Sequence, residues 1–185
     1  MLTRTGIDAG DTVLIYGAGT VGLTVLQVAK LHGARCLVAD IDAARLARAE
    51  SFGADVTIHS LREDVASRVA AENDGRGPTL VIDGAGVPAL LAEACRVASP
   101  AGRIGILGFS PAPCAVSQQE IVKKELALFG SPLNRALLPQ VMGWLASGRL
   151  KPAAMITQTF AARDAFDLIE RHPERTVKVQ LDFAG

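Results

Sequence analysis

The sequence is poor in the side chains that bind nucleic acids or cross-link a small fold. Only 4% of its 185 residues are aromatic, and 19 basic side chains balance 19 acidic ones. Without a basic run or an aromatic platform, we expect no nucleic-acid partner. The three cysteines, Cys36, Cys95 and Cys114, lack C-x-x-C spacing, so they predict neither a disulfide framework nor a zinc site. Cys36 and Cys95 are interpreted as core residues.

Long apolar runs and a leader-like start are also missing. No stretch reaches the length that spans a bilayer, and the first five residues do not resemble a signal peptide. We therefore expect a cytoplasmic protein that does not contact a membrane. Hydrophobic residues still make up 49% of the sequence, which predicts some apolar surface that a partner covers.

The sequence offers few groups for acid–base or metal chemistry. Its three histidines, His32, His59 and His172, are scattered along the chain, and no H-E-x-x-H, G-x-S-x-G or Y-x-x-x-K pattern occurs. Each histidine is interpreted as a surface or structural residue. We expect no catalytic residue and no metal ligand in this chain.

What the sequence does contain is a glycine-rich turn between an apolar run and an amphipathic segment. Residues 13–15 suit a parallel strand buried on both faces, and residues 20–32 have apolar side chains at helical spacing. Gly17, Gly19 and Gly22 follow the G-x-G-x-x-G spacing of a dinucleotide-binding turn. The first allows a tight turn, the second lets a pyrophosphate approach, and the third lets the helix pack on the strand. The helix N-terminus would favour the phosphates.

An acidic residue at the end of the next apolar run strengthens this interpretation. Residues 36–39 form that run and Asp40 closes it, 23 positions after Gly17. This is the expected position of the acid that binds the adenosine ribose of a dinucleotide. The alternative is that Asp40 only caps the following helix, which opens near Asp42.

The charge of Asp40 selects between the two nicotinamide dinucleotides. A carboxylate accepts hydrogen bonds from both ribose hydroxyls, whereas a 2′-phosphate beside it costs about 4 kcal/mol per unit-charge pair before screening, at ~4 Å and an effective dielectric of about 20. NAD is therefore predicted over NADP. Arg45 could instead hold a 2′-phosphate, but we interpret it as a contact at the edge of the adenosine.

Strand and helix patterns alternate beyond this turn. Further strands are expected at 56–58, 79–83, 103–107 and 126–129, with helices near 43–52 and 64–72 and a short segment at 121–124. Residues 84–88 are expected to open another helix that runs to about residue 98, with Pro88 in its first turn. Right-handed crossovers place these strands in one doubly wound parallel sheet of the α/β class, a six-stranded Rossmann sheet of order 3-2-1-4-5-6. This domain is expected to cover residues 1–132.

The remaining residues, 133–185, have a different character. They predict an amphipathic helix around 137–145, a strand at 156–160, a helix at 163–172 and an alternating strand at 176–183. These strands do not fit the six-stranded sheet and need another layer to cover them. We expect a short α+β tail that belongs to an incomplete second domain.

Six segments together carry a family resemblance: residues 10–23, 83–88, 102–108, 124–131, 146–152 and 176–179, with Asp40 and Arg45 beside them. They resemble the carboxyl-terminal part of a medium-chain dehydrogenase/reductase of the zinc-type alcohol, polyol and threonine dehydrogenase group. The resemblance covers the whole chain. It implies that a GroES-like first half holds the catalytic zinc, often with a second, structural zinc. We therefore expect this chain to be an inactive piece of a longer enzyme, with zinc only in the full-length protein.

The resemblance also implies cofactor contacts residue by residue. The implied cofactor-binding residues are Gly17, Gly19, Thr20, Val21, Gly22, Asp40, Arg45, Ala85, Gly86, Val87, Leu107, Gly108, Phe109, Ala127, Phe129 and Lys178. Residues 85–87 would line the adenosine-to-nicotinamide side, 107–109 and 127–129 the nicotinamide, and Lys178 the pyrophosphate. The cofactor that these contacts imply is NAD.

For the intact enzyme, the resemblance implies oxidation of a secondary alcohol, a polyol or a sugar acid by hydride transfer to NAD. One alternative is a zinc-free quinone or enoyl reductase of the same superfamily, which uses NADPH. Asp40 argues against it, because such members tend to carry a small residue and a basic one there. The other alternative is a non-catalytic NAD-binding module, against which the incomplete tail argues. The particular substrate is not predicted, since the residues that select it lie mostly in the missing half.

The last strand of the expected sheet predicts an assembly. Residues 126–130 begin with the apolar run Leu-Ala-Leu-Phe, and no later strand of the sheet covers them. We expect a homodimer in which this edge pairs across a twofold axis, as the resemblance implies. The alternative is that a helix over residues 135–147 covers the edge.

Overall fold

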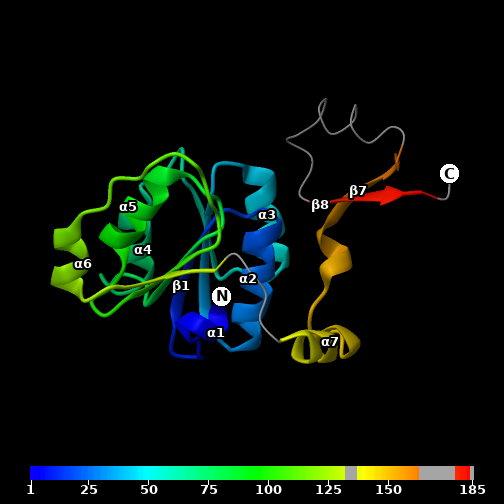
Figure 1. The fold of residues 1–185 in the computed structure, drawn as a ribbon, viewed down its shortest axis with the longest axis horizontal. Coiled ribbons are helices and arrows are strands. Elements are labelled where there is room, and N and C mark those ends of the chain that lie inside the picture. The colour runs from blue at the N-terminus through cyan, green and yellow to red at the C-terminus, as the bar shows by residue number, and fades with distance from the viewer. Residues whose placement is uncertain (132–136, 163–177, 184–185) are drawn as a thin grey trace. The chain divides into compact units, whose positions relative to one another are not determined.

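The computed structural model describes residues 1–131, 137–162 and 178–183 (Figure 1). The chain divides into two compact units, Met1–Leu138 and Pro139–Gly185. Across the described ranges, no helix combines the length and the apolar character needed to cross a membrane.

The first unit is built around a six-stranded parallel sheet in the order β3-β2-β1-β4-β5-β6. Its strands are β1 Thr12–Tyr16, β2 Arg35–Asp40, β3 Val56–His59, β4 Leu80–Asp83, β5 Arg103–Ile106 and β6 Ala127–Gly130. The predicted fold class and strand order are therefore confirmed. The chain builds β1 to β3 in one direction and then crosses back to β4, so the strand order switches direction between β1 and β4.

Helices cover both faces of this sheet. On one side lie α2 Thr20–Leu31 and α3 Ala43–Ser51, and on the other lie α4 Val65–Glu72, α5 Pro88–Val97 and α6 Gln118–Lys124 (Figure 1). Asp42, Asp64 and Ser117 cap α3, α4 and α6 by accepting a hydrogen bond from a backbone N–H of the first turn. A short polar side chain thus marks where each of these three helices begins.

β1 runs through the middle of the core and is buried on both faces. Leu14 and Tyr16 pack in one cluster with Val69 of α4 and Cys95 of α5. Ile15 points to the opposite face, where it lies beside Gly22 at the start of α2. Burial on both faces is the reason that the strand consists of an unbroken apolar run.

Besides shifts of a few residues in the bounds of several elements, the first unit differs from the sequence-based expectation in two places. A short helix, α1 Leu2–Thr5, precedes β1 and was not predicted. β6 starts at Ala127 and not at Leu126, because Leu126 closes the end of α6 by donating its N–H to the Ile121 carbonyl, and its side chain is buried. Part of the predicted apolar edge is therefore covered within its own unit.

The second unit is small. Its elements are α7 Leu138–Ala146, which begins at the boundary, the 3-10 helix η1 Pro152–Met155, and the strands β7 Ile156–Ala161 and β8 Lys178–Asp182. β7 and β8 form a parallel pair separate from the six-stranded sheet, which confirms the prediction that the tail strands do not join it. The helix predicted at 163–172 lies outside the described residues, and so does the beginning of the strand predicted at 176–183.

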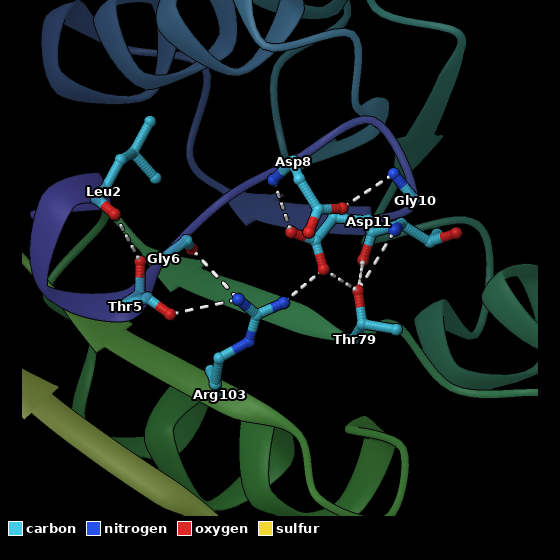
Figure 2. Close-up of polar contacts among 9 residues, drawn as sticks. Leu2, Thr5, Gly6, Asp8, Gly10, Asp11, Thr79 and Arg103 are labelled. Carbon is cyan, nitrogen blue, oxygen red and sulfur yellow. Dashed lines mark hydrogen bonds and ion pairs between the residues drawn. The ribbon is translucent and has the colours of Figure 1, made fainter.

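A partly buried ion pair ties together the amino ends of three strands in the first unit (Figure 2). Asp11, just before β1, accepts hydrogen bonds from the Asp8 backbone N–H at 3.0 Å and from the Thr79 hydroxyl, just before β4, at 2.6 Å. It also pairs with Arg103, the first residue of β5. The Arg103 guanidinium donates in turn to the Thr5 carbonyl at the end of α1, at 3.0 Å. The pair therefore holds α1 against the amino edge of the sheet.

We predict that Arg103→Ala destabilises the first unit, because Asp11 is only 4% exposed and would remain buried without its cation. The free energy of unfolding, measured by urea denaturation, should fall by about 2 to 3 kcal/mol. Arg62→Ala is the matched control, because Arg62 is exposed, and it should change this value by less than about 0.5 kcal/mol. Equal losses in the two variants would contradict the role of the pair.

Candidate cofactor site

Three turns lie next to one another at the carboxyl ends of the central strands. They follow β1, β4 and β5, which are neighbours in the sheet. In open parallel sheets, ligands bind at this edge, where the strand order switches direction. The candidate site is therefore the edge formed by these turns and by the end of β2.

The turn after β1 brings strand and helix into backbone contact. Gly17 has a φ of +92°, which favours glycine, and donates its N–H to the Ala39 carbonyl of β2 at 2.8 Å. A Cβ on Gly22 would overlap the Gly17 carbonyl oxygen, so only glycine lets α2 begin this close to β1. These observations confirm the tight turn and the close helix packing predicted for the two glycines.

The N-terminus of α2 suits an anion. Gly19 is its N-cap, and no side chain of the described residues caps this end of the helix. A Cβ on Gly19 would meet no atom within 4 Å, so a ligand has room to approach the backbone there. The amides and the macrodipole of a 12-residue helix favour negative charge at this point. The pyrophosphate of a dinucleotide fits these features.

Asp40 connects the end of β2 to the glycine turn. One carboxylate oxygen accepts a hydrogen bond from the Ala18 N–H at 2.7 Å and the other from the Asp42 N–H at 3.0 Å, and the residue is 7% exposed. Each oxygen has a further lone pair with which it can accept a hydrogen bond from a ribose hydroxyl. The alternative that Asp40 caps α3 is wrong, because Asp42 caps this helix by accepting from Ala44 and Arg45.

Arg45 lies in the first turn of α3. Its Nε is 3.9 Å from the Asp42 carboxylate, and this nitrogen is buried without a hydrogen-bond partner in the part of the chain that the structure describes. The side chain is 33% exposed, so it reaches the surface beyond this contact. Its contact with the adenosine edge stays a prediction.

The turns after β4 and β5 pack against each other through glycine. A Cβ on Gly108 would overlap the Gly86 nitrogen, so the two backbones touch. Asp83, the last residue of β4, accepts hydrogen bonds from the Ala85 and Gly86 N–H groups at 3.0 and 2.9 Å. Sequence reasoning missed Asp83 as a site residue. The available signal was an acid that ends a fully apolar strand and precedes Gly-Ala-Gly.

Most of the predicted contact residues converge at this edge. On it or immediately beside it lie Gly17, Gly19, Thr20, Val21, Gly22, Asp40, Ala85, Gly86, Val87, Leu107, Gly108 and Phe109. Three of them expose apolar side chains, with Val21 at 43%, Val87 at 50% and Phe109 at 92%. Apolar side chains gathered around backbone turns are typical of a binding surface.

Two other predicted contacts, Ala127 and Phe129, are not brought to this edge. In the register of β5 and β6, Ala127 lies beside Arg103 at the amino end of β5, and Phe129 lies beside Gly105. Lys178 is the first residue of β8 and belongs to the second unit. The cofactor contacts of these residues stay predictions.

The described residues hold few groups for acid–base or metal chemistry. Burial raises the pKa of the Cys36 thiol to about 12 and also raises the pKa of Cys95, so both stay protonated in the core, as expected. Burial and the Glu93 carboxylate, 3.0 Å from its hydroxyl, raise the pKa of Tyr16 well above its ordinary value. Within the described ranges, no three histidine, cysteine or acidic side chains are grouped to hold a metal ion. The arrangement is suited to binding and orienting a ligand.

Known proteins share this sequence pattern. The family model of the zinc-binding dehydrogenases matches residues 20–147. The starvation-sensing protein RspB of Escherichia coli K12 is 42% identical over 179 residues, which are 94% of this chain and 52% of RspB. The D-arabitol-phosphate dehydrogenase of Enterococcus avium is 32% identical over 187 residues, which cover 97% of this chain and 53% of that enzyme.

A solved structure shares the fold. The alcohol dehydrogenase rspB of Escherichia coli CFT073, in complex with the cofactor NADH, is 40% identical and superposes with a TM-score of 0.90, over 98% of this chain and 55% of that one. This chain spans about half the length of the curated relatives it matches. Because the family model covers most of the sequence, the chain belongs to the family of zinc-binding dehydrogenases.

Proposed function

We propose that this chain binds NAD at the carboxyl edge of its first unit, as the cofactor-binding part of a dehydrogenase. The contact between Asp40 and the glycine turn is the observation on which the proposal rests. The Asp40 carboxylate lies 2.7 Å from the Ala18 nitrogen, close to the uncapped start of α2. A ribose and the pyrophosphate next to it can therefore be held at the same time. The NADH in the 40% identical Escherichia coli structure supports this cofactor.

The charge of Asp40 favours NAD over NADP. The carboxylate is buried and held by backbone donors, so it cannot swing away from a 2′-phosphate. At ~4 Å, the repulsion is about 4 kcal/mol per unit-charge pair before screening. The NADPH-dependent reductase of the same superfamily is therefore the less favoured function.

In the intact enzyme we propose the oxidation of a secondary alcohol, a polyol or a sugar acid. When bound, NAD would supply the hydride acceptor for the alcohol carbon, and the residues of this chain would hold the dinucleotide in place. Removing the alcohol proton requires a base or a metal, and among the described residues no three histidine, cysteine or acidic side chains are grouped to hold a metal ion. We assign that step to a catalytic half that holds zinc in the full-length protein. The polyol-phosphate relative supports this substrate class.

The second unit is proposed to be part of that catalytic half. Its β7 and β8 form a pair of their own, apart from the six-stranded sheet. Such a small pair needs a further layer to bury its apolar face. In this proposal, the domain boundary lies near residues 132–133, and Lys178 contributes a positive charge to the pyrophosphate.

A reducing compartment fits the cysteines of the chain. Cys36, Cys95 and Cys114 are free thiols, and the first two are buried. Free thiols are the common state in the cytoplasm, whereas secreted proteins tend to use theirs in disulfides. The cytoplasm is therefore the proposed location.

We predict that the 185-residue chain binds NAD at least about tenfold more tightly than NADP, a difference of ~1.4 kcal/mol. Asp40→Asn removes the charge and keeps an acceptor oxygen, so the ratio of the two dissociation constants should move toward NADP by about tenfold. Isothermal titration calorimetry with both nucleotides measures this ratio. No hydride transfer is expected from this chain alone.

Asp55→Asn is the matched control for this experiment. Asp55 lies before β3, where it pairs with Lys30 at 2.8 Å and accepts the Cys36 N–H, away from the glycine turn. The control should leave the NAD to NADP ratio within about twofold of the original chain. Tighter binding of NADP by the unaltered chain would overturn the assignment of Asp40 and favour the reductase.

We also propose that the edge of β6 forms a homodimer. In the described part of the chain, β6 pairs with β5 alone. The Ala127 N–H donates to the Gly102 carbonyl and the Ser131 N–H to the Ile106 carbonyl, so odd-numbered residues face β5. The backbone N–H and C=O groups of Leu128 therefore point away from β5, toward the open edge of the sheet. They can pair with a second copy across a twofold axis.

We predict that Leu128→Pro abolishes this dimer, because proline removes the outward N–H without removing a bond to β5. Leu128→Ala is the control, since it shortens the same side chain and keeps the N–H, and it should remain dimeric. Sedimentation equilibrium at several concentrations measures the mass. If the unaltered chain is monomeric at all concentrations, the edge of β6 does not pair with a second copy. That result would favour the alternative, in which a helix over residues 135–147 covers this edge.

A further inference from the structure

Asp83 is a buried acid at the carboxyl edge, and it is not among the predicted cofactor contacts. It ends β4, whose four residues are all buried, and it is itself 4% exposed. A charged side chain in such a place costs free energy unless hydrogen bonds replace its water. The hydrogen-bond donors around Asp83 therefore indicate the role of its carboxylate.

Asp83 holds the turns on both sides of its strand end. Its side-chain Oδ1 accepts from the Ala85 and Gly86 N–H groups at 3.0 and 2.9 Å. Its backbone carbonyl accepts from the Leu107 and Gly108 N–H groups, both at 2.9 Å. Four donors, two from the turn after β4 and two from the turn after β5, thus converge on one residue.

The two turns cannot move independently of each other. Gly86 has a φ of +72°, and a Cβ on it would lie 2.9 Å from the Phe109 nitrogen. On the other side, the Gly84 N–H donates to the Tyr16 carbonyl at 3.0 Å, just before the glycine turn of β1. A change at the carboxylate of Asp83 is therefore transmitted to the backbone of the neighbouring turn.

The geometry points to Asp83 as a positioning residue for the nicotinamide half of NAD. This inference rests on the proposed function. Asp40, at the end of β2, sets the adenosine half, and a dinucleotide crosses the switch point between β1 and β4. The other half then lies over the turns after β4 and β5, whose shape Asp83 holds. If the carboxylate is lost, the Ala85 and Gly86 N–H groups lack their acceptor, and the turn relaxes toward the ligand.

The test compares a ligand that spans the whole edge with one that uses only its adenosine side. In the 185-residue chain, Asp83→Ala should weaken NAD binding by about tenfold or more, while the dissociation constant of AMP stays within about twofold. Asp83→Asn keeps one uncharged acceptor and should give an intermediate loss for NAD, with AMP unchanged. Calorimetry measures NAD, and an NMR titration measures the weaker AMP.

Asp64→Ala is the matched control. Asp64 also accepts a backbone N–H, from Ser67 at 2.8 Å, but it caps α4 and holds neither of the two turns. It should leave the ratio of the NAD and AMP constants unchanged, even if it lowers the thermal unfolding midpoint. If Asp83 had only a structural role, both Asp83→Ala and Asp64→Ala would lower the thermal unfolding midpoint. Neither variant would then change the ratio of the NAD and AMP dissociation constants.

The outcomes separate the inference from the proposed function. An unchanged NAD to AMP ratio in a folded Asp83→Ala chain overturns the role of Asp83. If circular dichroism shows that this variant does not fold, Asp83→Asn decides in the same way, and an unchanged ratio there overturns the role. If the unaltered chain binds neither nucleotide, the proposed function fails, and the role of Asp83 fails with it.

Discussion

Contact of backbone with backbone at the carboxyl edge of the sheet is the constraint on which the rest of the first unit depends. A Cβ on Gly22 would overlap the Gly17 carbonyl, and one on Gly108 would overlap the Gly86 nitrogen. Because no side chain enters these contacts, the turns lie close enough for buried acids to bond their N–H groups. Those bonds define the backbone surface on which a dinucleotide can lie. The shape of the site therefore depends first on the glycines, which allow the backbones to touch.

Most of the sheet could be predicted because β1, β2 and β4 are buried on both faces, and such strands consist of unbroken apolar runs. The handedness of the crossovers then leaves one strand order. Local pattern could not reveal α1, because its four residues depend on distant contacts. Arg103 bonds to the Thr5 carbonyl across 98 positions of sequence. Periodicity within a window of about 11 to 18 residues carries no trace of such a contact.

From spacing alone, the site could be predicted only where a contact lies at a fixed distance along the sequence, whereas residues 85–87 and 107–109 followed from the family resemblance. Asp40 accepts a hydrogen bond from the turn that begins at Gly17. Its spacing from Gly17 along the sequence identifies it as a site residue. Asp83 ends its strand in the same way, but its side chain bonds to its own turn, so no long-range spacing distinguishes it. The place of Ala127 depends on the register with β5, which is a property of the pair of strands. A motif within either strand alone cannot specify it.

The two buried acids of this edge serve different purposes, although each is held by main-chain donors. Asp40 accepts from Ala18, 22 positions earlier, and so sets the separation between the end of β2 and the turn after β1. Asp83 accepts from residues two and three positions later and sets the shape of one turn. Each charge stays buried only while its donors keep their places. Packing at this edge and recognition of a ligand therefore depend on the same atoms, and the edge can hold a defined shape before a cofactor arrives.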